Sequence, residues 1–179
     1  MTSLTPDETI LGILAAYAQH GYQILETFND PQKLGRVWHL STSQLYAVLK
    51  RLEREGWIAG RQIESENAPP RTQYAITSEG RNILEAWLND GAPSPSIRHV
   101  RVEFLSRLYV AQLLGHSVES IITRQRLICQ NERTRLLANA ESGFGLLASD
   151  LVIAQLDAVL EWLERCVLVF DSHPSEKSS

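Results

Sequence analysis

The chain has 179 residues and a formal net charge of −4, with 44% hydrophobic and 21% charged residues. These values are typical of a folded protein with one sizeable domain or two small ones, and they exclude a bulk polycation. Because no apolar run approaches the roughly 20 residues that span a bilayer, and the N-terminus lacks the basic start and apolar core of a signal peptide, we expect a cytoplasmic protein without a membrane segment.

Two helices are predicted ahead of residue 40. Pro6 suits the first turn of the first helix, whose apolar side chains form a broad face: Ile10, Leu11, Ile13, Leu14 and Tyr17. The second helix follows His20-Gly21, and its apolar positions are Tyr22, Leu25 and Phe28. Trp38 and Leu40 then lead into a third helix.

This third helix is predicted from about Ser41 to Glu55. Ser41 can cap the N-terminus, and Gln44 stands three residues later, which is the spacing of a capping box. Apolar residues then recur at helical spacing: Leu45, Val48, Leu49 and Leu52. Gly56 is suited to end the helix because glycine adopts the left-handed conformation without a steric cost.

The outward face of the third helix is polar near its start and basic near its end. At about 100° per residue, the residues opposite the apolar row are Ser43, Ala47, Lys50 and Arg54. Gln44 and Tyr46 lie on the flanks. Short polar side chains can reach base edges in a major groove while Lys and Arg contact phosphates. The alternative is an ordinary amphipathic helix with a solvated charged face.

Basic residues are concentrated around this helix although the whole chain is acidic. Between residues 33 and 61, six basic residues stand against two acidic ones, which is a local net charge of +4. The basic residues are Lys33, Arg36, Lys50, Arg51, Arg54 and Arg61. Such a patch predicts phosphate contacts and a salt-dependent affinity if two copies act together.

Two short strands with a polar turn are predicted after Gly56. Trp57 and Ile58 open the first strand, and Tyr74 and Ile76 alternate with polar residues in the second. A helix followed by two strands in this order predicts a winged helix-turn-helix, and the wing favours DNA over the solvated-face alternative. The overall fold class is therefore mainly α with a small two-stranded β-wing.

The composition along the chain predicts two domains. Residues 5–89 form the winged helix-turn-helix and end with a helix that starts near Ser78. Residues 90–96 are a linker by their Gly, Pro and Ser content. Residues 97–171 are expected to form a helical dimerisation domain, and residues 172–179 a flexible tail.

The last helix carries a heptad-like seam. Six apolar residues recur at spacings of 3, 4, 3, 4 and 3: Ile153, Leu156, Leu160, Leu163, Val167 and Phe170. A second row lies beside it at Val152, Val159 and Cys166. One row can pack within the chain and the other against a second chain, because DNA reading heads normally act as twofold pairs. The alternative is that both rows are buried in an intramolecular bundle.

The sequence favours no enzymatic chemistry. Cys129 and Cys166 are far apart with no CxxC spacing, so we expect reduced, buried thiols. The five histidines lack metal-ligand spacing, and no nucleophile or phosphate-loop motif is present. We therefore expect no enzyme, metal or cofactor. A winged-helix protein–protein adaptor without DNA binding is the competing functional hypothesis.

The chain resembles the PadR family of transcriptional regulators. The motifs that carry this resemblance span the first 80 residues: Ile10-Leu11-Gly12-Ile13-Leu14, His20-Gly21-Tyr22, Ser43-Gln44-Leu45-Tyr46, Leu49-Lys50-Arg51-Leu52-Glu53-Arg54-Glu55-Gly56, Tyr74-Ala75-Ile76-Thr77 and Gly80. From Arg98 onward, length and pattern are similar to the helical domain of the longer PadR subfamily. The resemblance implies a repressor that binds DNA as a homodimer through its C-terminal helices.

The resemblance also implies site residues. Ser41, Ser43 and Gln44 are candidates for base edges, and Tyr46 and Lys50 for phosphate or base contacts. For Gln44, capping competes with DNA contact, and Tyr46 has the alternative of a half-buried packing residue. Further candidate cationic contacts are Arg51 and Arg54 on the helix and Arg71 in the wing. A small aromatic or hydrophobic effector is also implied, with no site assigned.

The wing departs from the family pattern. Many relatives carry several basic residues ahead of the second strand, whereas here Arg71 is the one basic residue in the turn, and Glu64 and Glu66 are acidic. Carboxylates repel phosphate, so we expect the recognition helix to matter more than the wing. Arg71 and Arg61 have the alternative of pairing with these nearby glutamates.

Overall fold

The computed structural model describes residues 4–65, 68–139 and 142–171, with the side chains of 65, 68–70 and 168–171 left out of the description. The chain divides into two compact units. Unit 1 is Met1–Asn89 with Leu105–His116, and unit 2 is Asp90–Phe104 with Ser117–Ser179. The predicted tail, 172–179, lies outside the described residues.

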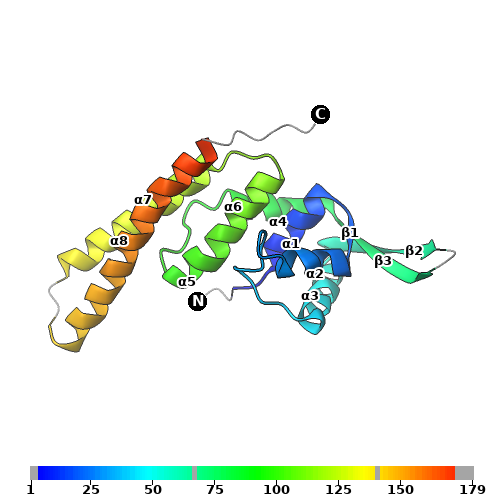
Figure 1. Cartoon of the computed structure of the whole chain (residues 1–179), viewed down its shortest axis with the longest axis horizontal. Coiled ribbons are helices and arrows are strands. Elements are labelled where there is room, and N and C mark those ends of the chain that lie inside the picture. The colour runs from blue at the N-terminus through cyan, green and yellow to red at the C-terminus, as the bar shows by residue number, and fades with distance from the viewer. Residues whose placement is uncertain (1–3, 66–67, 140–141, 172–179) are drawn as a thin grey trace. The chain divides into compact units, whose positions relative to one another are not determined.

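Unit 1 is a small helical body with a β-wing (Figure 1). Its elements are α1 (Asp7–Ala16), β1 (Gln19–His20), α2 (Gly21–Asn29), α3 (Thr42–Arg54), β2 (Ile58–Ser65), β3 (Ala68–Ile76), α4 (Ser78–Leu88) and α6 (Leu105–Leu113). The expected mainly helical fold class is confirmed. Each predicted helix of the winged helix-turn-helix is present within two residues of its expected start.

Helix α1 is the centre of the core of unit 1. Four of its apolar side chains are at most 2% exposed: Ile10, Leu11, Ile13 and Leu14. It packs against α4, α6 and β3. Gly12 makes the approach of α6 possible, because a Cβ atom there would lie 2.3 Å from a Val110 methyl group. This contact explains why a glycine stands in the middle of an otherwise apolar helix.

The wing contains three strands rather than the predicted two. The sheet order is β1-β3-β2, and both pairings are antiparallel. Ile58 pairs with Ile76 and Gly60 with Tyr74 across the wing hairpin, while Gln19 of the two-residue β1 pairs with Tyr74 from the other side. A strand of two residues shows no periodicity in the sequence. It is recognised as a strand only through its pairing with β3.

Unit 2 is a helical body of α5 (Ile97–His99), the π-helical turn η1 (Val100–Phe104), α7 (Glu119–Ala138) and α8 (Phe144–Asp171). Helices α7 and α8 pack together along their length, with Arg133 ion-paired to Asp157. Phe104 meets Trp162 edge-on at 5.9 Å between ring centroids. The predicted grouping of 97–171 differs from this division, because α6 packs on α1 and therefore belongs to unit 1.

The seam of α8 faces the interior of unit 2. Leu156 and Leu163 are 1% and 0% exposed, and Ile153, Leu160 and Val167 are partly buried. Their burial is within one chain, which corresponds to the intramolecular alternative. The side chain of Phe170 lies outside the described residues. Dimerisation through these six residues stays a prediction.

The two cysteines are free thiols in the core of unit 2. Cys129 is 0% and Cys166 8% exposed. Burial raises the pKa of both thiols, so they are neutral at physiological pH and poorly nucleophilic. Among the described residues, no helix has both the length and the apolar character needed to cross a bilayer.

Candidate nucleic-acid interface

Helix α3 begins with the capping box that the sequence predicts. The Gln44 backbone N–H donates to Ser41 Oγ at 3.2 Å, and the Ser41 backbone N–H donates to Gln44 Oε1 at 2.9 Å. Leu45, Leu49 and Leu52 are fully buried against unit 1. The helix ends at Arg54, and Gly56 just beyond it has a φ of 76°, the left-handed conformation expected there.

The opposite face of α3 is exposed. Its exposed residues are Ser41, Ser43, Gln44, Tyr46, Ala47, Lys50 and Arg54. Ser43 Oγ lies 3.1 Å from Ser41 Oγ, so two hydroxyl groups stand together at the start of the helix. The structure therefore presents the predicted polar start and basic end on one accessible face.

Two of the predicted cationic contacts are ion-paired within the chain. Arg51 Nη2 lies 2.6 Å from Asp7 Oδ1, and the side chain of Asp7 is only 7% exposed. Arg51 thereby neutralises a buried carboxylate of α1 and is not part of the outward face. Arg54 Nη2 lies 2.9 Å from Glu55 Oε1, but both side chains are solvent-exposed, and such a pair is weak.

The wing is tied to α3 by hydrogen bonds to the backbone. Glu53 Oε1 accepts the Gly60 N–H of β2 at 3.0 Å. The Thr77 hydroxyl donates to the Gly56 carbonyl at 2.7 Å, and its oxygen accepts the Gly80 N–H, which caps α4. These contacts hold the base of the wing beside the C-terminal end of the recognition helix.

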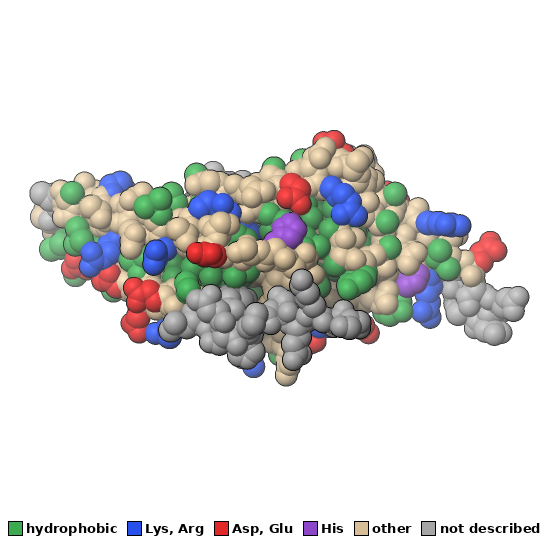
Figure 2. Space-filling model, turned by 90° about the horizontal axis from the view of Figure 1, so that it is seen from above, with side chains coloured by type: hydrophobic (Ala, Val, Ile, Leu, Met, Phe, Trp, Pro, Cys, Tyr) green, Lys and Arg blue, Asp and Glu red, His purple; other side chains and the backbone are tan. Residues whose placement is uncertain are grey.

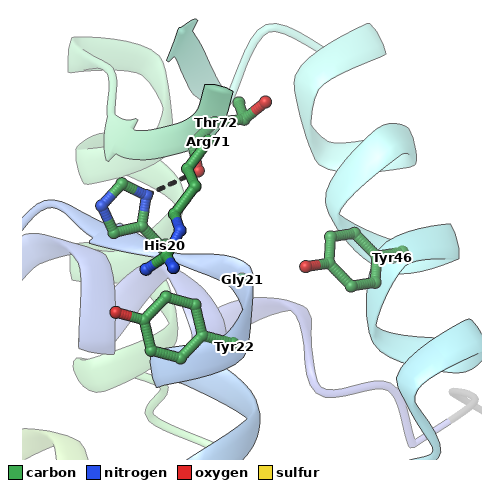
Figure 3. Close-up of a pocket in the computed structure, with 6 residues that line it drawn as sticks. All are labelled: His20, Gly21, Tyr22, Tyr46, Arg71 and Thr72. Atoms are coloured by element: carbon green, nitrogen blue, oxygen red, sulfur yellow. Dashed lines mark hydrogen bonds between the residues drawn. The ribbon is translucent and has the colours of Figure 1, made fainter. Parts of the chain in front are cut away.

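A hollow of about 500 Å³ lies between α3, the start of α2 and β3 (Figure 3). Its lining residues are His20, Gly21, Tyr22, Tyr46, Arg71 and Thr72. Two of the predicted site residues, Tyr46 and Arg71, are thus brought to one place from different elements. Figure 3 shows the Tyr46 hydroxyl pointing into the gap between α3 and Arg71.

Tyr46 is close to the backbone of α2. A Cβ atom at position 21 would lie 2.9 Å from the Tyr46 ring, so the ring occupies the space that a side chain at Gly21 would need. Tyr46 is 45% exposed. The ring therefore packs on the start of α2 while much of the residue stays exposed, as expected for the half-buried alternative. A DNA contact of Tyr46 stays a prediction.

Arg71 is held over an aromatic ring. Its guanidinium carbon lies 5.4 Å from the centroid of the Tyr22 ring, and the His20 ring is stacked on Tyr22 at 5.8 Å. His20 Nδ1 lies 3.1 Å from the Thr72 carbonyl oxygen, and because a carbonyl only accepts, this nitrogen carries the proton. Among the described residues, no ion pair joins Arg71 to Glu64, which was the alternative predicted for Arg71. Glu66 lies outside the described residues.

Sequence reasoning missed His20 and Tyr22 as site residues. They carry the family motif, but their role depends on β3 lying beside the start of α2, which is a contact between residues about 50 positions apart. On the face drawn in Figure 2, the blue Lys and Arg side chains near the wing are interspersed with other types.

Comparison with known proteins places the chain among named regulators. Residues 10–86 match the model of the transcriptional regulator PadR-like family, and they include all of α3 and the wing. The negative transcriptional regulator PadR of Bacillus subtilis (strain 168) is 29% identical over 140 residues, which cover 74% of this chain and 75% of that protein. A probable transcriptional regulator of Mycobacterium tuberculosis is 28% identical over 79 residues, 44% of this chain and 41% of that protein.

Two solved structures of the Bacillus subtilis protein also align with this chain. The crystal structure of Bacillus subtilis PadR in complex with operator DNA is 26% identical and covers 89% of this chain and 96% of that chain, with a TM-score of 0.47. The structure of that protein in complex with p-coumaric acid is 25% identical and covers 93% and 95%, with a TM-score of 0.43.

Proposed function

Because the chain belongs to the PadR-like family of transcriptional regulators, we propose that it is a repressor that binds a promoter site as a homodimer through α3. One observation supports the proposal that α3 binds DNA. The exposed face of α3 places Ser43, Tyr46 and Lys50 in solvent, while the opposite face is buried. The Bacillus subtilis relative is named a negative regulator, which supports repression as the sign of regulation.

The chemistry of α3 suits entry into a major groove by its N-terminal end. The Ser43 hydroxyl can donate to or accept from a base edge. Gln44 Oε1 is engaged with the backbone of Ser41, so its NH₂ group is the part available to a base acceptor. Lys50, farther along the helix, is suited to a phosphate and contributes a salt-dependent share of the affinity.

In the proposed homodimer, a second copy of the chain supplies the second recognition helix. The face of α8 opposite its buried seam carries a row of exposed apolar side chains: Phe144, Leu147 and Leu151, which are 85%, 66% and 60% exposed. We propose that this row, with its neighbours on α7, forms the dimer contact, because burying it removes apolar surface from water. Green hydrophobic side chains reach the surface at the α7 and α8 end in Figure 2.

The homodimer would place its two recognition helices about one turn of DNA apart, roughly 34 Å. A dimer bound over a promoter blocks transcription. A small aromatic or hydrophobic effector, which the family resemblance implies, releases the DNA to the extent that it prefers a state with a different spacing. A regulator of promoters works where the chromosome is, so we propose a cytoplasmic location.

A mobility-shift titration tests this proposal. The probes are the DNA upstream of the protein's own coding sequence and a random-site library, each at two salt concentrations. We expect a discrete shifted species that weakens as salt increases, because binding releases cations from the DNA and this release becomes less favourable at higher salt concentration. If neither probe shifted, the repressor proposal would be overturned in favour of the adaptor, and a pull-down would search for its protein partner.

A further inference from the structure

The hollow beside α3 has a composition suited to an oxyanion. All six described lining residues are neutral or basic: His20, Gly21, Tyr22, Tyr46, Arg71 and Thr72. Arg71 contributes a guanidinium with several N–H donors, and Tyr46 a hydroxyl group. Together they offer one cationic and one neutral hydrogen-bond donor to the same space, which suits the anionic oxygens of a phosphodiester.

Arg71 is pre-positioned by the aromatic residues beside it. With its guanidinium carbon 5.4 Å from the Tyr22 centroid, the cation lies over the ring face and is attracted to it. Stacking uses the face of a guanidinium and leaves its edge, which carries the N–H groups, for a ligand. The His20 ring supports Tyr22 from the stacked side and is itself fixed by its hydrogen bond to the Thr72 carbonyl.

We propose that this hollow binds one phosphate of the operator backbone in each half-site. Arg71 and the Tyr46 hydroxyl contact the phosphate, and Tyr22 is a positioning residue that holds Arg71. This inference rests on the proposed function and deepens it. It assigns to the wing a backbone contact made at its base, from β3, and it assigns to Tyr46 a phosphate rather than a base edge. The acidic residue Glu64 farther along the wing is therefore compatible with DNA binding.

The direct test uses operator DNA in which single phosphates are replaced by neutral methylphosphonates. The wild-type protein should lose roughly ten- to hundredfold in affinity at one symmetry-related pair of positions, as for a charge-assisted hydrogen bond. Arg71→Ala should bind unmodified DNA more weakly by a similar factor but should lose nothing further at those positions. Arg71→Ala should also lower the slope of log affinity against log salt by about 0.9 for each half-site.

The positioning role of Tyr22 has its own readout. Tyr22→Phe keeps the ring and should retain the wild-type affinity and salt slope, whereas Tyr22→Leu should reproduce the reduced salt slope of Arg71→Ala. Tyr22 is 43% exposed, so neither variant should unfold, and circular dichroism checks this. Tyr46→Phe, which removes only the hydroxyl, should weaken binding without changing the salt slope.

Several results would overturn the inference while leaving the repressor proposal intact. One is a wild-type protein that binds its operator but loses no affinity at any methylphosphonate position, or loses as much as Arg71→Ala does. Another is an Arg71→Ala variant whose base preference changes instead of its salt slope. Specific competition by inorganic phosphate at constant ionic strength, without methylphosphonate sensitivity, would assign the hollow to a free oxyanion. Failure of the wild-type protein to bind any DNA would instead remove the proposed function itself.

Discussion

Neighbouring cationic residues on α3 have different roles because the helix turns them in different directions. Lys50 is exposed, whereas Arg51, one residue later, lies 2.6 Å from a carboxylate oxygen of Asp7. A buried carboxylate without a partner is costly, so Arg51 stabilises the junction between α3 and α1. The sequence predicted both residues as DNA contacts, because the position of Asp7, more than 40 residues away, cannot be inferred from local spacing.

Arg51→Ala should therefore mainly reduce stability. We expect the free energy of unfolding to fall by about 1–3 kcal/mol, nearer the lower value because the Arg51 side chain is 39% exposed and water can partly replace it. Arg54→Ala is the matched control and should change stability by less than about 0.5 kcal/mol, since its pair is exposed. Urea denaturation followed by circular dichroism measures both. An Arg51→Ala protein of unchanged stability that no longer binds DNA would instead make Arg51 a DNA contact.

At the scale of the element, the recognition helix is the part of the fold that the sequence predicted best. Its signals are local: a capping box at Ser41 and Gln44, a row of leucines at helical spacing, and a glycine at its end. The hollow could not be predicted in the same way. It requires α2, α3 and β3 to meet, and β1, which pairs with β3 and leads into α2, is only two residues long.

The capping box can be tested separately from DNA contact. Ser41→Ala removes the oxygen that accepts the Gln44 N–H and should lower the free energy of unfolding by about 1 kcal/mol. Ser41→Asn should retain most of the stability because Asn is an equally good N-cap. Chemical denaturation at equal protein concentration compares them. Equal stability of Ser41→Ala and wild type would show that the cap contributes nothing, and would leave DNA contact as the role of this serine.

At the scale of the whole molecule, the sequence predicted a heptad seam on α8 but could not say which chain it faces. Periodicity identifies an apolar face, whereas its partner depends on tertiary packing. In the structure α7 and α8 pack together and Leu156 and Leu163 of the seam are buried, whereas the opposite face of α8 is exposed at Phe144, Leu147 and Leu151. The dimer contact that we propose therefore lies on the opposite face of α8, about half a turn around the helix from the predicted seam.

Leu151→Glu should convert the dimer into a folded monomer, because a carboxylate buried at the interface lacks a partner. Asn82→Glu, on the exposed surface of α4, adds the same charge in unit 1 and should leave the dimer intact. Leu156→Ala, at a buried position, should instead destabilise the fold by about 2–5 kcal/mol. Sedimentation velocity and thermal unfolding give the two readouts. A Leu151→Glu protein that remained dimeric would refute this placement of the interface.

The measurement that tests the central claim most directly compares two charge reversals in a fluorescence-anisotropy titration on the operator. Lys50→Glu changes the exposed face of α3, and Arg81→Glu makes the same change on the exposed surface of α4. If α3 reads the DNA, Lys50→Glu should weaken binding by about tenfold or more and reduce the salt slope, while Arg81→Glu should bind like wild type. Equal losses in both variants would mean that net charge alone governs binding, and an unaffected Lys50→Glu protein would contradict the assignment of α3 as the recognition helix.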